Sequence, residues 1–187
     1  MDDAGNQRGF EAFLAAAKGD SLPPVERWSP PYCGDIGMAI GADGTWFYQG
    51  SPIGRQPLVR LFSRILRRDE DGRYYLVTPV EKVDVAVEDA PFLAVEMQVD
   101  GRGPAQKMAF RTNVGDVVVC DRDHPLRFAV EPTTGALKPY VLVRGRLEAR
   151  LPRALLFDVV ELAIETGEPL GIWSCGVWFA LPGGALG

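Results

Sequence analysis

The chain contains an internal repeat, and this feature limits its possible architectures more than any other. The stretch GSPIGRQPLVRLFSRIL, which begins at residue 50, aligns without a gap with GRLEARLPRALLFDVVE, which begins at residue 145. Between 50–72 and 145–167, seven of 23 positions are identical, whereas ordinary composition gives roughly one or two matches. Two copies are too few for a solenoid, so the repeat predicts a duplicated domain whose halves bury their faces against each other.

Each copy has the pattern of a strand, a turn, a helix and a further strand. Pro57 and Pro152 occupy the first turn of the expected helices, where the missing N–H group costs nothing. We expect the helix of the first copy to continue through Leu66 and to end at the DEDGR segment. The alignment places two pairs of residues at equivalent positions that we expect to face the core: Leu61 with Leu156, and Phe62 with Phe157.

The remaining sequence alternates apolar and polar residues between turn signals, which is typical of antiparallel strands. A helix is expected at 7–18 and a proline-rich connector after it. The predicted fold is α+β: an internally duplicated, mainly antiparallel sheet with one helix per repeat and an extra N-terminal helix. The expected divisions are 1–32 for the N-terminal helix and connector, 33–95 for the first repeat domain, and 96–187 for the second.

Composition excludes several classes of protein. A net charge of -5 and a pI near 5.0 argue against general binding of nucleic acid or anionic membranes. The sequence has no apolar run of about 18 residues, so we expect no membrane span. The N-terminal segment lacks the pattern of a secretory signal. Three widely spaced cysteines, Cys33, Cys120 and Cys175, predict free thiols and a cytoplasmic location.

The sequence carries no recognisable catalytic or metal-binding signature. P-loop, G-x-S-x-G, G-x-G-x-x-G and zinc-type spacings are absent. His124 is the only histidine, which excludes a multi-histidine metal site. The segment from Asp69 begins like a calcium loop, but its twelfth position is Val80 and not a bidentate glutamate. We therefore expect no catalytic residue, no metal and no cofactor.

Three stretches together resemble a known family. They are CGDIGMAIGADGTWFYQGSPIGRQPLVRLFSRIL, DGRYYLVTPVEKVDVAVEDAPF and PYVLVRGRLEARLPRALLFDVVELA, and they are similar to the bacterial DUF1285 family of uncharacterised proteins over about residues 24–175. The resemblance implies a two-domain core built by duplication, with a second half loosely similar to pleckstrin-homology folds. It also implies a ligand site at the domain interface and a part in signal transduction, and no activity is established for this family.

Two arginines stand at the same place in the repeat. Arg55 and Arg150 each lie two residues before the proline that opens a helix. An arginine beside a helix N-terminus is typical of an anion site. The alternative is that they bridge a carboxylate such as Glu148, or donate to carbonyl groups between the domains.

The other candidate site residues are expected at the seam between the domains. The resemblance favours the TPVEK stretch, whose polar members are alternatively exposed neighbours in a turn. Aromatic residues near the seam are candidates for pocket walls, although core positions are their usual place. The complete set of candidate ligand-binding residues is Arg55, Thr78, Glu81, Lys82, Arg150, Trp46, Tyr75 and Trp173.

The expected helix of the first repeat copy also carries a basic face. It consists of Arg60, Arg64, Arg67 and Arg68 and is followed at once by acidic residues. Such a run usually marks a solvated helix face, and a phosphate-rich partner is the alternative.

The resulting functional prediction is a cytoplasmic ligand-binding or regulatory protein without catalytic activity, with a polar site between two duplicated domains. Its partner is expected to be a small anionic ligand or another protein. One alternative is a protein-interaction adaptor that acts through the pleckstrin-like half. Another is an enzyme that uses arginines and carboxylates of the seam. The sequence predicts neither the identity of the ligand nor the oligomeric state.

Overall fold

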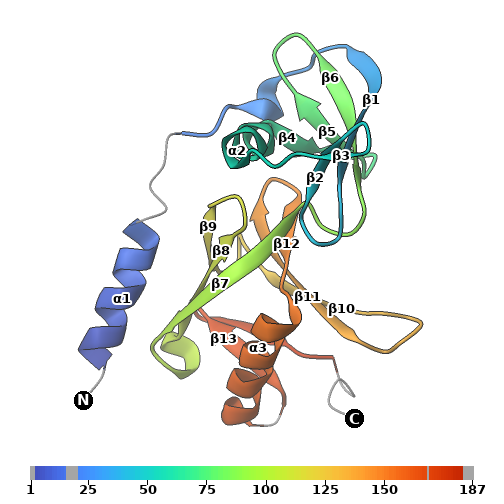
Figure 1. The fold of residues 1–187 in the computed structure, drawn as a ribbon. Coiled ribbons are helices and arrows are strands. Elements are labelled where there is room, and N and C mark those ends of the chain that lie inside the picture. Colours follow the sequence, from blue (N-terminus) through green and yellow to red (C-terminus); the bar gives the residue numbers. More distant parts are fainter. Residues whose placement is uncertain (1–2, 16–20, 168, 183–187) are drawn as a thin grey trace.

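The chain forms two curled sheets, each with one helix beside it, and a small third sheet (Figure 1). The structure is a computed structural model and describes residues 3–15, 21–167 and 169–182. The first half contains α1 (Asp3–Ala15), the short helix η1 (Val25–Arg27), β1 (Tyr32–Ile40), β2 (Trp46–Tyr48), β3 (Ser51–Pro52), α2 (Gln56–Arg64), β4 (Leu66–Arg68), β5 (Tyr74–Val77) and β6 (Lys82–Val87). The second half contains β7 (Phe92–Asp100), the short helix η2 (Gly103–Ala105), β8 (Lys107–Thr112), β9 (Val117–Cys120), β10 (Leu126–Val130), β11 (Leu137–Arg144), β12 (Leu147–Arg150), α3 (Arg153–Thr166), β13 (Gly171–Ser174) and β14 (Val177–Ala180).

The two large sheets repeat one strand order within the described part of the chain. In the first sheet β1 to β3 form one antiparallel meander, β4 to β6 form another, and β6 runs parallel to β1. In the second sheet β7 to β9 and β10 to β12 do the same, and β12 runs parallel to β7. The predicted duplication and α+β class are confirmed, and the repeated unit is a pair of meanders joined by a parallel contact.

The two helices occupy different places in this repeated unit. Helix α2 joins the two meanders of the first sheet, whereas α3 follows the last strand of the second sheet. The prediction that both aligned pairs face the core was wrong, because Leu61 is 56% and Phe157 is 54% exposed. Helix α2 buries Val59 and Ser63, but the residues of α3 that align with them, Ala154 and Asp158, are exposed. Helix α3 instead buries the next residue in each case, Leu155 and Val159. A shift of one residue corresponds to a rotation of about 100° around the helix axis.

Helix α2 is shorter than expected. It ends at Arg64, and Leu66 begins strand β4, which pairs with β5 through the turn that follows Asp69. Arg67 anchors this strand, because its guanidinium donates to the carbonyl groups of Val25 (2.7 Å) and Trp28 (2.8 Å). The proline-rich connector is thereby held against β4.

One apolar core extends through both domains. It includes Trp46 and Leu66 of the first domain together with Phe92, Phe110 and Val141 of the second, each at most 1% exposed. Because the two sheets contribute to the same core, neither domain completes its apolar packing alone.

The junction between the domains lies just before β7. All of β7 pairs in the second sheet, although the expected boundary at residue 95 falls inside this strand. We propose that 88–91 form the junction. At this junction Ala90 is buried and Glu88 accepts a hydrogen bond of 2.9 Å from the amide of Ala42.

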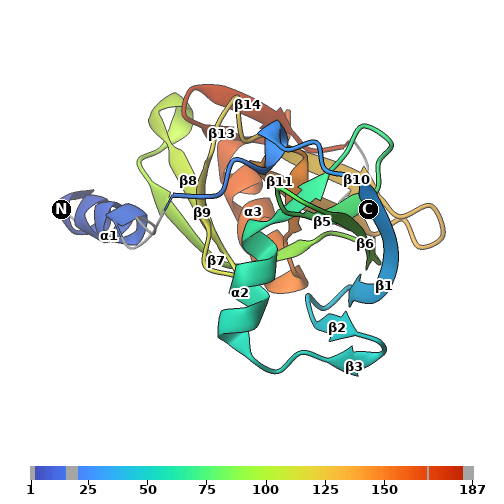
Figure 2. The same cartoon turned by 90° about the horizontal axis from the view of Figure 1, so that it is seen from above.

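The N-terminal helix packs on the second domain. Phe10 and Phe13 of α1 are buried against Ala109 of β8, beside Val117 and Val119 of β9. Figure 2 shows α1 at the side of the molecule, next to β8 and β9. The expected helix at 7–18 is confirmed as far as Ala15, and its last three positions lie outside the described residues.

Substitution of Trp46 tests the shared core. Trp46→Ala is expected to lower the free energy of unfolding by about 3–5 kcal/mol, because it removes a fully buried indole and leaves a cavity. Leu61→Ala on exposed α2 surface is the control and is expected to cost about 0.5 kcal/mol or less. Chemical denaturation measures both, and equal costs would contradict this description of α2.

Candidate functional site

The expected site residues of the TPVEK stretch form a turn. The hydroxyl of Thr78 accepts a hydrogen bond of 3.1 Å from the amide of Glu81, and the amide of Thr78 donates to the Glu81 carbonyl at 2.9 Å. The ammonium group of Lys82 lies 2.9 Å from Asp69 and 4.3 Å from the centre of the Tyr75 ring. Thr78 and Glu81 therefore bond to each other in the turn between β5 and β6, while Lys82 bonds to Asp69.

Tyr75 belongs to the same cluster. It is 2% exposed, and its hydroxyl donates to Asp71 at 2.6 Å. This hydrogen bond and burial raise the pKa of Tyr75 to about 12. The same bond holds the pKa of Asp71 below its usual value. The arrangement stabilises the turn after β4.

Arg150 connects the two domains. Its guanidinium donates to the Ala42 carbonyl at 2.9 Å, and its Nε lies 3.3 Å from Asp89 Oδ2. The hydroxyl of Tyr140 donates to the other oxygen of Asp89 at 2.7 Å. Arg150 thus contacts both a carboxylate and a carbonyl group, the two kinds of structural contact that the sequence offered as the alternative to an anion site. Arg55 is exposed at the N-terminus of α2.

The two candidate tryptophans lie elsewhere. Trp46 is 1% exposed in the shared core and stacks on Phe62 at 6.2 Å between ring centres. Trp173 lies in the β13–β14 hairpin, where it packs on Trp178 at 5.2 Å and its carbonyl accepts a hydrogen bond from Gln106. The structure thus brings Thr78, Glu81, Lys82 and Tyr75 together, but it does not gather all eight expected residues in one pocket.

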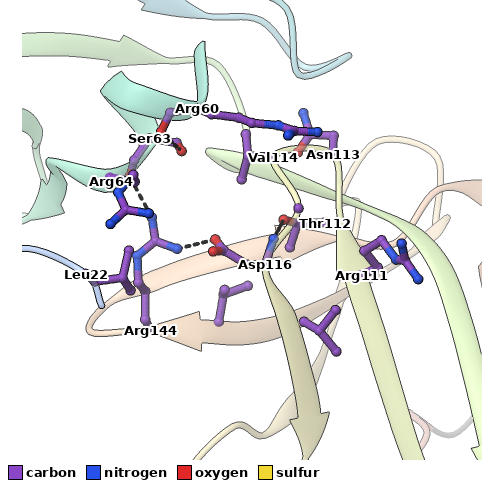
Figure 3. Close-up of a pocket in the computed structure, with 13 residues that line it drawn as sticks. Leu22, Arg60, Ser63, Arg64, Arg111, Thr112, Asn113, Val114, Asp116 and Arg144 are labelled. Carbon is purple, nitrogen blue, oxygen red and sulfur yellow. Dashed lines mark hydrogen bonds and ion pairs between the residues drawn. The ribbon is translucent and has the colours of Figure 1, made fainter. Parts of the chain in front are cut away.

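A different hollow lies between the domains. It has a volume of about 640 Å³ and is formed by the end of α2, the β8–β9 turn, the end of β11 and the connector (Figure 3). The lining includes four arginines, one carboxylate, three uncharged polar side chains and several apolar groups. Its main members are Arg60, Ser63, Arg64, Arg111, Thr112, Asn113, Val114, Asp116, Val143, Arg144 and Leu22. We call it the interdomain cavity.

Arg144 lines one side of this cavity. Its guanidinium pairs with Asp116 and donates to the Ser63 carbonyl at 2.6 Å, as the dashed lines in Figure 3 show. It also lies 5.0 Å from the centre of the Phe92 ring. Ser63 is in the last turn of α2, where carbonyl groups lack helical partners and the helix dipole is negative. Arg144 of the second domain therefore caps a helix of the first domain.

The β8–β9 turn orients Asp116. The Thr112 hydroxyl accepts a hydrogen bond of 3.1 Å from the Asp116 amide, and the Thr112 amide donates to the Asp116 carbonyl at 2.8 Å. Asn113 exchanges hydrogen bonds with the backbone of Leu93 on β7. The neighbouring β1–β2 turn approaches so closely that a Cβ atom at Gly44 would lie 2.7 Å from Asn113 Nδ2.

The remaining arginines add positive charge. Arg60 and Arg64 are four residues apart on α2 and therefore share a face. Arg64 donates to the Ser21 carbonyl at 2.7 Å, and Arg111 lies 3.2 Å from Glu96. Although the whole chain has a net charge of -5, the lining of this cavity has more guanidinium groups than carboxylates. Such a lining can bind an anion.

Sequence reasoning found part of this site. It assigned Arg60, Arg64, Arg67 and Arg68 to one basic helix face. Arg60 and Arg64 do lie on α2, and their spacing of four residues was the usable signal. The assignment of Arg67 and Arg68 was wrong, because α2 ends at Arg64 and both residues belong to β4. It missed Asp116 and Arg144, which are 28 residues apart and surrounded by ordinary strand sequence. Within the described ranges no group of histidine, cysteine, aspartate and glutamate residues is arranged to hold a metal ion. Likewise, no described helix has the length and hydropathy needed to cross a membrane.

The fold and the interdomain cavity define a two-domain, internally duplicated α+β protein. The family model for the N-terminal domain of DUF1285, a domain of unknown function, matches 23–90, and the model for the C-terminal domain of this family matches 91–181. The chain belongs to the DUF1285 family. No functionally curated protein matches it.

Two crystal structures of family members are similar to this chain. A DUF1285 family protein from Silicibacter pomeroyi DSS-3 is 48% identical, with a TM-score of 0.82 over 90% of this chain and 93% of that protein. A second, from Shewanella baltica OS155, is 28% identical, with a TM-score of 0.52 over 68% of this chain and 92% of that protein.

The hydrogen bond between Tyr140 and Asp89 predicts a loss of stability at alkaline pH. Burial and this bond raise the pKa of Tyr140 to about 12 from an ordinary value of 10.0. The neutral hydroxyl therefore contributes stability fully below about pH 10, and this contribution decreases as the pH rises towards about 12. Unfolding measured between about pH 8 and pH 11.5 should show the decrease. Tyr140→Phe should make it shallower but not abolish it, because the pKa of Tyr75 is raised in the same direction.

Substitution of both partners tests the pair formed by Arg144 and Asp116. Arg144→Met is expected to lower the free energy of unfolding by about 2 kcal/mol, because it leaves a partly buried carboxylate unpaired and the end of α2 uncapped. The double variant Arg144→Met/Asp116→Asn should lose about 1 kcal/mol less than the sum of the two single changes. Additive losses in denaturant unfolding would show that the pair contributes nothing.

Proposed function

We propose that this protein binds a small organic anion in the interdomain cavity and has no catalytic activity. The proposal rests on one observation: guanidinium groups from both domains line the interdomain cavity. Arg60 and Arg64 come from α2, and Arg144 comes from β11 (Figure 3). Guanidinium groups bind carboxylate and phosphate oxygens through paired, charge-assisted hydrogen bonds.

The size and walls of the cavity suit a small molecule. Ligand pockets usually have volumes of about 300–1,000 Å³, and the volume of about 640 Å³ lies in this range. Val114, Val143 and Leu22 supply apolar surface, while Thr112 and Asn113 supply polar groups. A metabolite that carries a phosphate or several carboxylates on a partly apolar body matches this lining.

Asp116 is the counter-ion of Arg144. Its carboxylate already pairs with Arg144, as the acidic group of a ligand would. An entering anion would compete with Asp116 and with the Ser63 carbonyl for the same guanidinium. Since Arg144 joins the two domains, occupancy would alter their contact, and this supports a regulatory role of the kind expected in signal transduction.

The alternatives have less support. Asp116 is the only carboxylate among the described lining residues and is paired with Arg144, so an acid–base mechanism has no second group to use. The second alternative is an adaptor that binds another protein through the second domain alone. It would not use the arginines that α2 of the first domain contributes to the cavity. We further propose a cytoplasmic location, supported by the free thiols Cys33, Cys120 and Cys175.

Calorimetric titration with inorganic phosphate, pyrophosphate and citrate tests the proposal. The wild type is expected to bind at least one of these anions, and Arg60→Gln should weaken that binding about tenfold by removing one charge-assisted contact. Asp116→Asn should strengthen it about threefold or more, because it removes a competing negative charge.

Arg55→Gln is the matched control. It removes the same charge from the same helix at an exposed position outside the cavity lining, so affinity should remain unchanged. The absence of binding at millimolar anion, or an equal loss in Arg55→Gln and Arg60→Gln, would contradict the proposal.

A further inference from the structure

Helix α3 is apolar on two faces. Leu155, Val159 and Ala163 are buried against the second domain. On another face, Phe157 is 54% and Ile164 is 56% exposed. A helix that covers a core normally presents polar residues on its outer face, so this second apolar face needs a separate explanation.

The exposed apolar residues form one continuous stripe. Phe157, Val160 and Ile164 follow the spacing of three and four residues that places side chains on one helix face. Val160, between the other two, is half-buried. We call these three residues the α3 stripe. Figure 1 shows α3 at the bottom of the molecule, beside β13 and below the strands of the second sheet.

Charges at the two ends of the stripe have opposite signs. Arg153 stands at the N-terminal end, with its guanidinium 5.3 Å from the centre of the Phe157 ring. Glu165 is exposed near the C-terminal end, and Glu161 is exposed between Val160 and Ile164. The helix dipole has the same polarity, positive at the N-terminus and negative at the C-terminus.

A surface with this pattern is complementary to itself in the antiparallel direction. When two α3 helices pack antiparallel, the apolar stripe of one covers that of the other. Arg153 of each copy then lies beside Glu165 of the other, and the two helix dipoles are opposed favourably. A single twofold axis satisfies both contacts at once, which is the usual symmetry of homodimers. A parallel arrangement would place like charges together.

We propose that two copies of this chain form a twofold-symmetric dimer through antiparallel packing of the α3 stripe. The partner is a second copy, because the distribution of charge along the stripe matches the stripe itself. One helix face buries less area than a standard interface of about 1,600 Å². The dimer therefore dissociates in the micromolar range and is concentration-dependent. It does not involve the interdomain cavity, so it is independent of anion binding.

Sedimentation velocity of the full chain at increasing concentration tests this proposal. The wild-type mass should rise from 20.4 kDa towards twice that value over about 1–200 µM. Arg153→Glu and Glu165→Arg should each weaken association about tenfold, because each places like charges at both ends of the interface. The double variant Arg153→Glu/Glu165→Arg restores the pairing with reversed signs and should associate within about threefold of the wild type.

Two further variants separate the α3 stripe from general effects. Phe157→Ser should abolish association without loss of folding, since the side chain is already half exposed. Arg55→Glu, a charge reversal on the first domain, should leave association unchanged. A wild type that stays monomeric to about 200 µM overturns the proposal and leaves the stripe to a different protein. A double reversal that fails to restore association overturns the antiparallel arrangement.

Discussion

The guanidinium of Arg144 joins parts of the molecule that are far apart in the chain. It caps the last turn of α2 through the Ser63 carbonyl, pairs with Asp116 of the β8–β9 turn and lies over the Phe92 ring at the start of β7. These contacts fix the position of α2 relative to the second sheet. The interdomain cavity exists because this arrangement holds α2 above the β8–β9 turn without closing the space beside it.

Other arginines of the β11–β12 hairpin have similar roles. Arg146 lies 3.1 Å from Glu70, and Arg150 reaches the Ala42 carbonyl and Asp89. The contact between Arg146 and Glu70 is largely exposed and contributes little to stability. Arg144 and Arg150 are partly buried, so their contacts contribute more and also set the orientation of the domains. Of these two guanidinium groups, that of Arg144 lines the interdomain cavity and that of Arg150 does not.

The sequence repeat predicted that the chain is duplicated, but it did not predict which segments of the two halves are structurally equivalent. Composition and strand patterning predicted the α+β class and most elements, because side chains facing a core leave a local period in the sequence. The aligned segments predicted that two helices exist, but α2 ends at Arg64 and does not continue through Leu66, and Leu61 and Phe157 are exposed. Helices α2 and α3 also occupy different places in the repeated unit, so the alignment joined two helices that are not structural equivalents. The face that each helix buries therefore depends on the sheet beneath it and not on the alignment.

What the sequence determined alone is local: the strands, the turns, the two helices that begin near Pro57 and Pro152, and the basic face with Arg60 and Arg64. Only the tertiary structure decided the parallel pairing of β1 with β6 and of β7 with β12, and the meeting of Arg144 with Asp116 and Ser63. Helix and turn signals lie between residues a few positions apart. The cavity is made by residues from four segments, and their distances depend on how two curled sheets pack on one core, which no single segment encodes.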